Sequence, residues 1–389
     1  MPANDVFPSA EQRFEPRPRE IRRCLTELAS AHHAPGLVYT SPAVFELEKK
    51  RLFMKDWLCV ARVEEVENPG DYLTHDIMGE PIIVARNSDG VLHAYYNMCA
   101  HRGAELVQGR GNVKRLKCPY HAWTYDLAGQ LVGAPFMKET EGFDIADCRL
   151  RPLRLDTWAG WIFVSFDPNA APLINFLGFF ADEFDFLRQE NCRLAHKFVI
   201  ELDCNWKFVY ENLLDIYHVG TTHARTIGRL NKADSYQVHP GPRGRLSIHY
   251  EAGTMTPEGR SRVGKMPWLK GESDTIARIG FMPPNMSLLS RCDYVRPFVH
   301  WPLSPQRTRS IAYFLFPKEM VEQPDFTAKV QVYVDFLTEV LNEDLVMIKS
   351  LQRAMSSHGF APGRLSNMEH AIHHVTTNYL TRVFGGVES

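Results

Sequence analysis

Two short clips of metal-binding side chains lie close together in the sequence. The first reads Cys99-Ala100-His101, and the second, Cys118-Pro119-Tyr120-His121, follows after sixteen intervening residues. A set of two thiolates and two imidazoles suits either zinc or an iron–sulfur centre. In a Rieske [2Fe–2S] centre, two His replace two Cys on one of the irons. The four donors alone therefore leave a structural zinc site and a Rieske cluster open.

A second group of donor side chains follows Asn205 and comprises Asp215, His218 and His223. Asp215 and His218 have i, i+3 spacing, which predicts that they share a helix face and act together. His223 lies roughly 140° around an ideal helix from His218, so their imidazoles diverge on a straight helix. Gly220, followed by two Thr, offers a helix end that turns His223 back. The two His can then share one metal; separate structural roles are the alternative.

A third ligand for such a metal is expected from a predicted helix over residues 325–356, which carries Glu343 and Asp344. At roughly 100° per residue, the mean direction of the apolar side chains falls close to Asp344, and Glu343 points about 100° away. A carboxylate facing the core is costly unless it is paired, and a bound cation removes that cost. Asp344 is therefore the predicted ligand of a 2-His-1-carboxylate site. A buried salt bridge or a charge on the flank of the helix is the alternative.

The elements that position these residues differ along the chain. Residues 1–40 predict an N-terminal arm with a short helix, and residues 41–166 a helix followed by short strands separated by turns. The two clips lie on loops of this small all-β unit. Residues 167–389 alternate strands and helices, which is typical of an α+β domain built on an antiparallel sheet.

Composition excludes several classes of function. The chain has 389 residues, 44% of them hydrophobic, which is enough for two domains with cores. A net charge of −2 does not favour nucleic-acid binding, and the longest apolar run, near residues 158–166, is too short to span a membrane. The first residues contain no apolar signal core, so the expected location is the cytoplasm. Of eight Cys, the six outside the clips are expected to be reduced thiols.

The residues around both donor groups resemble one known family. Residues 97–103 and 118–125, with Gly129, are similar to the cluster-binding loops of Rieske proteins, especially the Rieske non-haem iron oxygenases. One departure is Ala122, where that family commonly has Gly. The pattern Asp-x-x-His-x-x-x-x-His after Asn205-Trp206-Lys207 resembles the mononuclear iron motif of the same family. The resemblance covers nearly the whole chain, with the motifs in family order.

This resemblance implies a fold and two cofactors. The fold is a small all-β Rieske domain plus a catalytic domain whose antiparallel sheet is flanked by helices, of the helix-grip type. Asp215 is implied to hydrogen-bond His218 and to reach His121 of a neighbouring subunit in a homotrimer. The implied ligands of the [2Fe–2S] cluster are Cys99, His101, Cys118 and His121, and those of a mononuclear Fe(II) are His218, His223 and Asp344.

The implied activity is that of the terminal oxygenase component of a multicomponent system with O2 as co-substrate. Because the chain lacks a Gly-x-Gly-x-x-Gly βαβ motif and a second Cys cluster, its electrons must come from a separate protein. We expect an NAD(P)H-dependent flavin or iron–sulfur reductase, with or without a ferredoxin. The favoured reaction is monooxygenase-type hydroxylation or oxidative demethylation or dealkylation of an aromatic or other small organic molecule. The alternatives are cis-dihydroxylation of an aromatic acid and, in other classes, a Rieske electron carrier or a zinc-stabilised binding module.

Some residues are candidates for shaping the substrate pocket or supporting the metal. Glu211 and Asn212 are expected to support His218 or Asp215, or to cap or solvate the helix. Residues 240–284 fit either a loop at a pocket entrance or a surface excursion. The pocket candidates are mostly apolar or aromatic, which favours a ring-bearing substrate, although each one also fits an ordinary core: Phe208, Leu213, Leu214, Phe281, Met282, Asn285, Met286, Leu288, Phe298, His300 and Phe314.

Overall fold

The computed structural model describes residues 18–232 and 234–385, which form two compact units. One unit runs from Phe53 to Phe176, and the other combines the described residues up to Leu52 with those from Leu177 onward. The sequence placed the corresponding boundaries at residues 41 and 167. The described part of the predicted N-terminal arm, 18–40, belongs to the same unit as the long C-terminal helix; residues 1–17 of that arm lie outside the described residues.

The unit from Phe53 to Phe176 is built from three small antiparallel sheets, as expected for an all-β domain. Its core joins the aromatic side chains of Tyr95, Trp123 and Tyr125 to the cysteines Cys99 and Cys118. The sheets have the strand orders β1 (Leu58–Arg62), β10 (Trp161–Ser165), β9 (Arg154–Trp158); β4 (Leu92–Tyr96), β3 (Glu80–Arg86), β2 (Asp71–Ile77), β5 (Arg110–Asn112); and β6 (Leu116–Lys117), β7 (Thr124–Tyr125), β8 (Leu131–Gly133).

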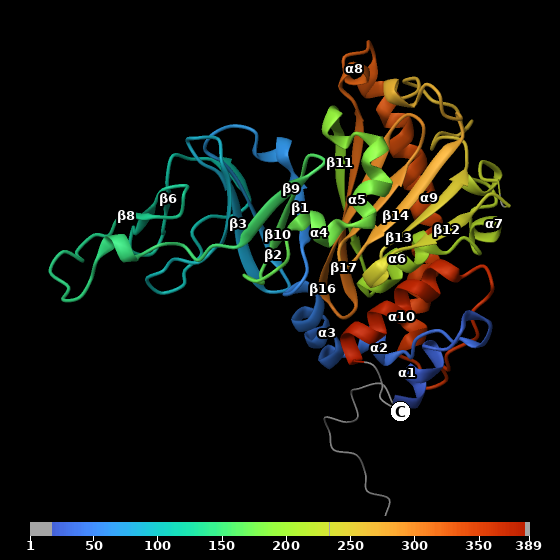
Figure 1. Cartoon of the computed structure of the whole chain (residues 1–389), viewed down its shortest axis with the longest axis horizontal. Helices are drawn as coiled ribbons and strands as arrows, with labels where there is room; N and C mark the ends of the chain where they lie inside the picture. Colours follow the sequence, from blue (N-terminus) through green and yellow to red (C-terminus); the bar gives the residue numbers. More distant parts are fainter. Residues whose placement is uncertain (1–17, 233, 386–389) are drawn as a thin grey trace, which may run out of the picture. The chain divides into compact units, whose positions relative to one another are not determined.

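The other unit is organised around a seven-stranded antiparallel sheet, whose two edge strands are labelled β11 and β12 in Figure 1. Six strands follow one another as neighbours, and the first strand of the unit pairs with the last, at one edge of the sheet. The order is β11 (Cys192–Leu202), β17 (Arg307–Pro317), β16 (Val295–Ser304), β15 (Met286–Ser290), β14 (Ile276–Met282), β13 (Leu246–Glu251) and β12 (Gln237–Pro240). Residues 240–284, which the sequence left as either a loop at a pocket entrance or a surface excursion, contain the strands β13 and β14.

Helices cover both faces of this sheet. On one face, Tyr210 of α6 (Trp206–Leu214) stacks on Phe281 of β14, with ring centroids 4.5 Å apart. On the opposite face, a Cβ at Gly280 would lie 2.4 Å from the Phe184 ring of α5 (Phe179–Phe184), so glycine is needed for this close approach. Apart from the long helix α9, the other described α-helices are α1 (Pro18–Cys24), α2 (Leu37–Thr40), α3 (Pro42–Glu48), α4 (Leu173–Leu177), α7 (Val219–Thr222), α8 (Lys318–Val321) and α10 (His370–Phe384).

The long helix α9 (Phe326–Met355) confirms the helix predicted over 325–356 to within one residue at each end. Its apolar stripe, including Tyr333, Leu337 and Val340, packs in one core cluster with Phe298 and Phe314 of the sheet. Asp344 continues this buried stripe and is only 6% exposed. The helix therefore presents a carboxylate on its inner face, as the angular argument predicted.

The prediction that one helix contains both Asp215 and His218 is wrong, because the helix ends before Asp215. Helix α6 starts after Asn205, whose side chain accepts a hydrogen bond from the Lys207 N–H at 3.1 Å, and it ends at Leu214. Asp215 is extended, and its Oδ1 accepts a hydrogen bond from the Tyr217 N–H at 2.8 Å. This local turn competes with the helix, because an aspartate side chain can satisfy backbone donors outside it. The break therefore falls before His218 and not at Gly220.

Among the described residues, no helix is both long enough and apolar enough to cross a membrane.

Candidate active site

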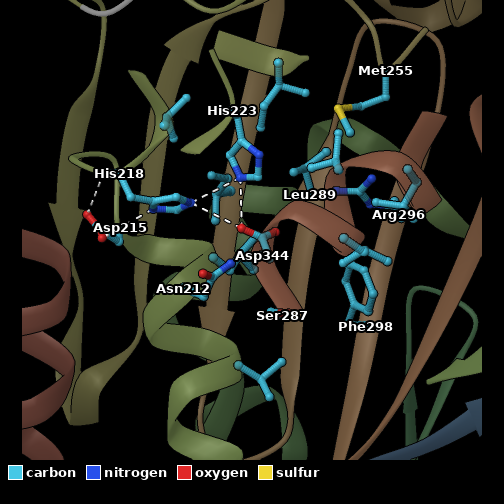
Figure 2. A pocket seen from close by; sticks show the side chains of 18 of the residues that line it. Asn212, Asp215, His218, His223, Met255, Ser287, Leu289, Arg296, Phe298 and Asp344 are labelled. Carbon is cyan, nitrogen blue, oxygen red and sulfur yellow. Dashed lines mark hydrogen bonds and ion pairs between the residues drawn. The ribbon is translucent and has the colours of Figure 1, made fainter. Parts of the chain in front are cut away.

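Three side chains from different elements converge at one point beside the sheet (Figure 2). His218 and His223 flank the single-turn helix α7, and Asp344 comes from α9. The Nε2 atoms of the two imidazoles lie 3.2 Å apart, and Asp344 Oδ1 lies 3.4 Å from that of His218 and 2.9 Å from that of His223. All three donor atoms are thus within 4.8 Å of one another. This is the donor set of a 2-His-1-carboxylate metal site, and it fits a divalent ion.

The charge of this cluster also suits a cation. Burial raises the pKa of Asp344, but hydrogen bonding and charge from the two His outweigh it, and the pKa lies below its usual value. Burial lowers the pKa of His218, whereas Asp215 and Asp344 together raise it to about 9. Two carboxylates thus attract positive charge to this point, which a bound metal ion can supply in place of protons.

The outer nitrogen of each imidazole faces a second carboxylate. His218 Nδ1 lies 3.3 Å from Asp215 Oδ2, and His223 Nδ1 lies 2.7 Å from Glu343 Oε2. Glu343 Oε2 also accepts a hydrogen bond from Thr226 Oγ1 at 2.6 Å. A carboxylate that receives the Nδ1 proton fixes the tautomer whose Nε2 lone pair is free to bind a metal. Glu343, whose direction on the helix made it the weaker ligand candidate, therefore lies behind His223.

The neighbouring pair Glu211 and Asn212 separates in the structure. Glu211 accepts a hydrogen bond from the Tyr39 hydroxyl at 2.7 Å, so it supports the packing of α2 and not His218. Asn212 lines the cavity beside Asp344 and helps to lower the pKa of that carboxyl group. Only Asn212 is thus placed to support the metal-binding group.

Replacing Glu343 by Gln is expected to weaken Fe(II) binding about 10- to 100-fold without unfolding the protein, because His223 loses the carboxylate that fixes its tautomer. Titration of the apoprotein with Fe(II) against a competing chelator measures this change. The matched control is Glu339→Gln, an exposed carboxylate one helical turn earlier on α9. Equal Fe(II) affinity in the wild type and the Glu343 variant would show that this contact is incidental.

The four clip donors form a buried pair and an outer pair. Cys99 and Cys118 are 3% and 2% exposed, and Cys99 Sγ lies 3.2 Å from the Tyr125 hydroxyl. His101 and His121 lie closer to solvent, with their Nδ1 atoms 3.2 Å apart. Two separate pairs fit a cluster with two irons, one bound by thiolates and one by imidazoles.

The backbone explains the one departure from the Rieske motif. Ala122 has φ of +60°, in the left-handed region where glycine carries no steric cost. Its N–H donates to the Cys118 carbonyl at 3.1 Å, which closes the turn of the second clip. An alanine costs only roughly 1–2 kcal/mol there, so the turn tolerates the methyl group.

An apolar cavity of about 110 Å³ lies beside the His218, His223 and Asp344 cluster. An engineered cavity of comparable size binds benzene, so this one suits a small molecule. Of the predicted pocket residues, Leu213, Phe298 and His300 line it. The prediction was wrong for the others, which include Met286 and Leu288: in β15 the cavity side carries the alternate residues Ser287 and Leu289.

Sequence reasoning missed several further residues of the cavity wall. They come from the sheet and from its connecting segments, including residues within 240–284: Tyr236, Tyr250, Met255, Ile279, Arg291 and Arg296. The two-residue period of β16 could have revealed Arg296, since it places that residue on the same face as Phe298 and His300. No comparable signal marks Tyr236 or Met255, which lie outside the strands.

An all-β unit with a Cys2His2 donor set and an α+β unit with a 2-His-1-carboxylate set together define a class of proteins with two metal centres. Comparison with known proteins gives the same division. A model of the Rieske [2Fe–2S] domain matches residues 56–148, and one of the ring hydroxylating alpha subunit (catalytic domain) matches residues 189–385. The chain belongs to the alpha-subunit family of Rieske non-haem iron oxygenases. Proteins of this family are oxidoreductases that incorporate O2 and use a [2Fe–2S] cluster and a mononuclear iron.

Similar proteins are matched over different shares of their length. The carnitine monooxygenase oxygenase subunit of Escherichia coli (strain K12) is 31% identical over 366 residues, which cover 90% of this chain and 93% of that protein. The corresponding subunit of Acinetobacter pittii (strain PHEA-2) is 40% identical over 207 residues, so the match spans only 54% of its length. The crystal structure of the quaternary ammonium Rieske monooxygenase CntA with an inhibitor has a TM-score of 0.78 and 27% identity, covering 95% of this chain and 99% of that one.

Proposed function

We propose that this protein is the terminal oxygenase of a Rieske system and carries out monooxygenation, of the oxidative demethylation or dealkylation type, on a small organic molecule. The observation that carries the proposal is the convergence of His218, His223 and Asp344 at the wall of an apolar cavity. Quaternary ammonium compounds are the first substrates to test, because relatives matched over most of their length include the oxygenase subunits of carnitine and glycine betaine monooxygenases and a quaternary ammonium Rieske monooxygenase.

In this proposal each donor residue has a distinct role. Cys99, His101, Cys118 and His121 hold the cluster, while His218, His223 and Asp344 hold the iron. When bound, the cluster supplies single electrons and the iron supplies open positions at which O2 is activated. Asp215 and Glu343 keep the two imidazoles in the metal-binding tautomer through their Nδ1 atoms. The apolar wall, with Leu213 and Phe298, excludes water and holds the substrate against this point.

Metal analysis separates this function from the two non-oxygenase alternatives. The purified protein is expected to contain about three iron and about two sulfide per chain, with the EPR signal of a reduced Rieske cluster. A simple electron carrier would contain about two iron, and a zinc module neither iron nor sulfide. If protein that is protected from metal loss during purification contained zinc and no iron, the proposal would be refuted.

A ring dihydroxylation is the second candidate, because residues 189–385 match the model of ring hydroxylating alpha subunits. Turnover with 18O2 distinguishes the reactions by atom count. A monooxygenase places one labelled oxygen atom in the organic product or its leaving fragment, whereas a dihydroxylating enzyme places two in the ring product. Quaternary ammonium compounds, other N-methyl compounds and aromatic acids form the substrate panel.

The proposed partners follow from the missing electron source. We infer an NAD(P)H-dependent flavin or iron–sulfur reductase, with or without a ferredoxin, since the sequence carries neither a dinucleotide motif nor a second Cys cluster. We also infer a homotrimer in which Asp215 of one subunit meets His121 of the next. The structure of CntA is described as giving insight into inter-subunit electron transfer in that enzyme. The cytoplasmic location stays a prediction.

A further inference from the structure

The wall of the cavity contains a buried guanidinium that the protein itself does not neutralise. Arg296 lies on β16, faces the cavity and is only 3% exposed. Its Nε and Nη1 atoms are buried and have no hydrogen-bond partner within the described part of the chain. Figure 2 shows Arg296 on the side of the drawn residues opposite His218, with His223 and Asp344 between them.

The neighbouring Arg291 shows how this fold satisfies an arginine that serves structure. Its Nε donates to the Gly253 carbonyl at 3.1 Å, and its Nη1 donates to the Ser290 carbonyl at 3.1 Å and to the Tyr250 hydroxyl. Arg291 therefore ties β15 and β13 to the segment that follows β13. No equivalent network is found for Arg296 among the described residues, and the Phe298 ring centroid lies 5.4 Å from its Cζ.

The other polar side chains facing this end of the cavity cannot balance the charge. His300 is fully buried, its two ring nitrogens each lie 2.9 Å from a hydroxyl, of Ser287 and of Ser310, and burial lowers its pKa to about 3. It is therefore neutral. Asp344 is paired with the two His of the metal site. Burying a charge without a counter-ion is strongly unfavourable. Arg296 therefore does not stabilise the fold where it lies, and a bound anion would remove the cost of its burial.

We propose that Arg296 binds an anionic group of the substrate, a carboxylate or a sulfonate, and so fixes which carbon atom lies next to the metal site. The inference rests on the proposed function, and it narrows the substrate class to small organic anions or zwitterions with an apolar middle. A guanidinium presents parallel N–H donors that match two oxygen atoms of such a group. The apolar walls between Arg296 and Asp344 then contact the body of the molecule.

Calorimetric titration of the anaerobic holoenzyme tests this inference without turnover. The probes are benzoate, benzenesulfonate and glycine betaine, each paired with a counterpart that lacks the anion: benzamide, benzenesulfonamide and choline. The wild type is expected to bind at least one anion tenfold or more tightly than its counterpart. Whether the benzoate, sulfonate or betaine arm responds identifies which kind of anion the cavity takes.

The variant Arg296→Met keeps the volume of the side chain and removes its charge. We expect it to bind the preferred anion about 30-fold or more weakly and to bind the counterpart within about threefold of the wild type. Arg296→Lys, which keeps the charge but loses the fork, is expected to be intermediate. The matched control, Arg307→Met, removes an exposed arginine of β17 and should change neither affinity.

The melting temperature reports on folding and 18O incorporation reports on function, so both are measured apart from binding. Because the Met variant loses an unpaired buried charge, its melting temperature should not fall. An unchanged affinity for the anion in Arg296→Met, or failure of every anion in the panel to bind the wild type, would overturn the inference. Arg296-dependent binding without 18O incorporation would instead refute only the proposed function. If the wild type and the Arg296→Met variant both oxygenated the neutral counterparts, only the inference of an anion-binding site would be refuted.

Discussion

Replacing Asp344 by Asn is expected to abolish turnover while leaving the Rieske cluster intact. The carboxylate oxygen that lies 2.9 Å from His223 Nε2 becomes part of a neutral amide, and the site loses the charge that binds a divalent ion. The iron content should fall from about three to about two per chain, with sulfide unchanged at about two. Activity should drop at least about 1000-fold, which is about 4 kcal/mol of transition-state stabilisation.

Two measurements distinguish loss of the metal from loss of the fold. Asn has nearly the volume of Asp, so the circular dichroism spectrum of the folded protein should be unchanged. The melting temperature of the metal-free protein should fall, because the ion pairs of Asp344 with His218 and His223 are lost. Glu339→Gln on the exposed face of α9 serves as the control and should keep three iron per chain and full activity. If the Asn variant kept its third iron and its activity, Asp344 would be a structural carboxylate, and the third ligand would have to come from elsewhere.

The parts of this molecule that could be predicted from sequence are those with strong periodicity or strict spacing. The apolar stripe of α9 gave both the extent of the helix and the inward direction of Asp344, because a 30-residue helix averages out local irregularities. The residue types and spacing of the two clips predicted a metal site, and only the resemblance of the surrounding residues favoured a Rieske cluster over zinc. In both cases a regular pattern in the sequence corresponds to a regular pattern in space.

Other features depended on contacts that no pattern reveals. Helix α6 ends early because the Asp215 side chain bonds the backbone of Tyr217, and propensity alone does not show when such a turn wins over another helical turn. Pocket residues were misassigned on β15 because a shift of one residue moves every side chain to the opposite face of the sheet. The contact of Glu343 with His223 has no sequence signal, because it joins two elements that lie 120 residues apart in the chain.

Asp215 joins the two centres in the proposed function, and its replacement by Asn is the second change with a large expected effect. The amide oxygen can still accept the turn bond from the Tyr217 N–H, so the loop should keep its shape. The negative charge that faces His218 Nδ1 at 3.3 Å is lost, together with the link proposed to a neighbouring subunit's His121. We expect iron binding to weaken no more than about tenfold and turnover to fall at least about 100-fold, or about 2.7 kcal/mol.

Two roles for Asp215 predict different results, and the rate of cluster reoxidation separates them. If Asp215 only orients His218, iron affinity and activity should fall together, and saturating Fe(II) should restore turnover. If it carries the contact between subunits, the iron-loaded variant should still accept electrons from its reductase but reoxidise its cluster slowly when mixed with substrate and O2 in a stopped-flow experiment. The control Asp203→Asn, an exposed carboxylate beyond β11, should behave as the wild type. Cluster reoxidation at the wild-type rate in iron-loaded Asp215→Asn would exclude the bridging role, because the only change made is at the proposed contact between the two centres.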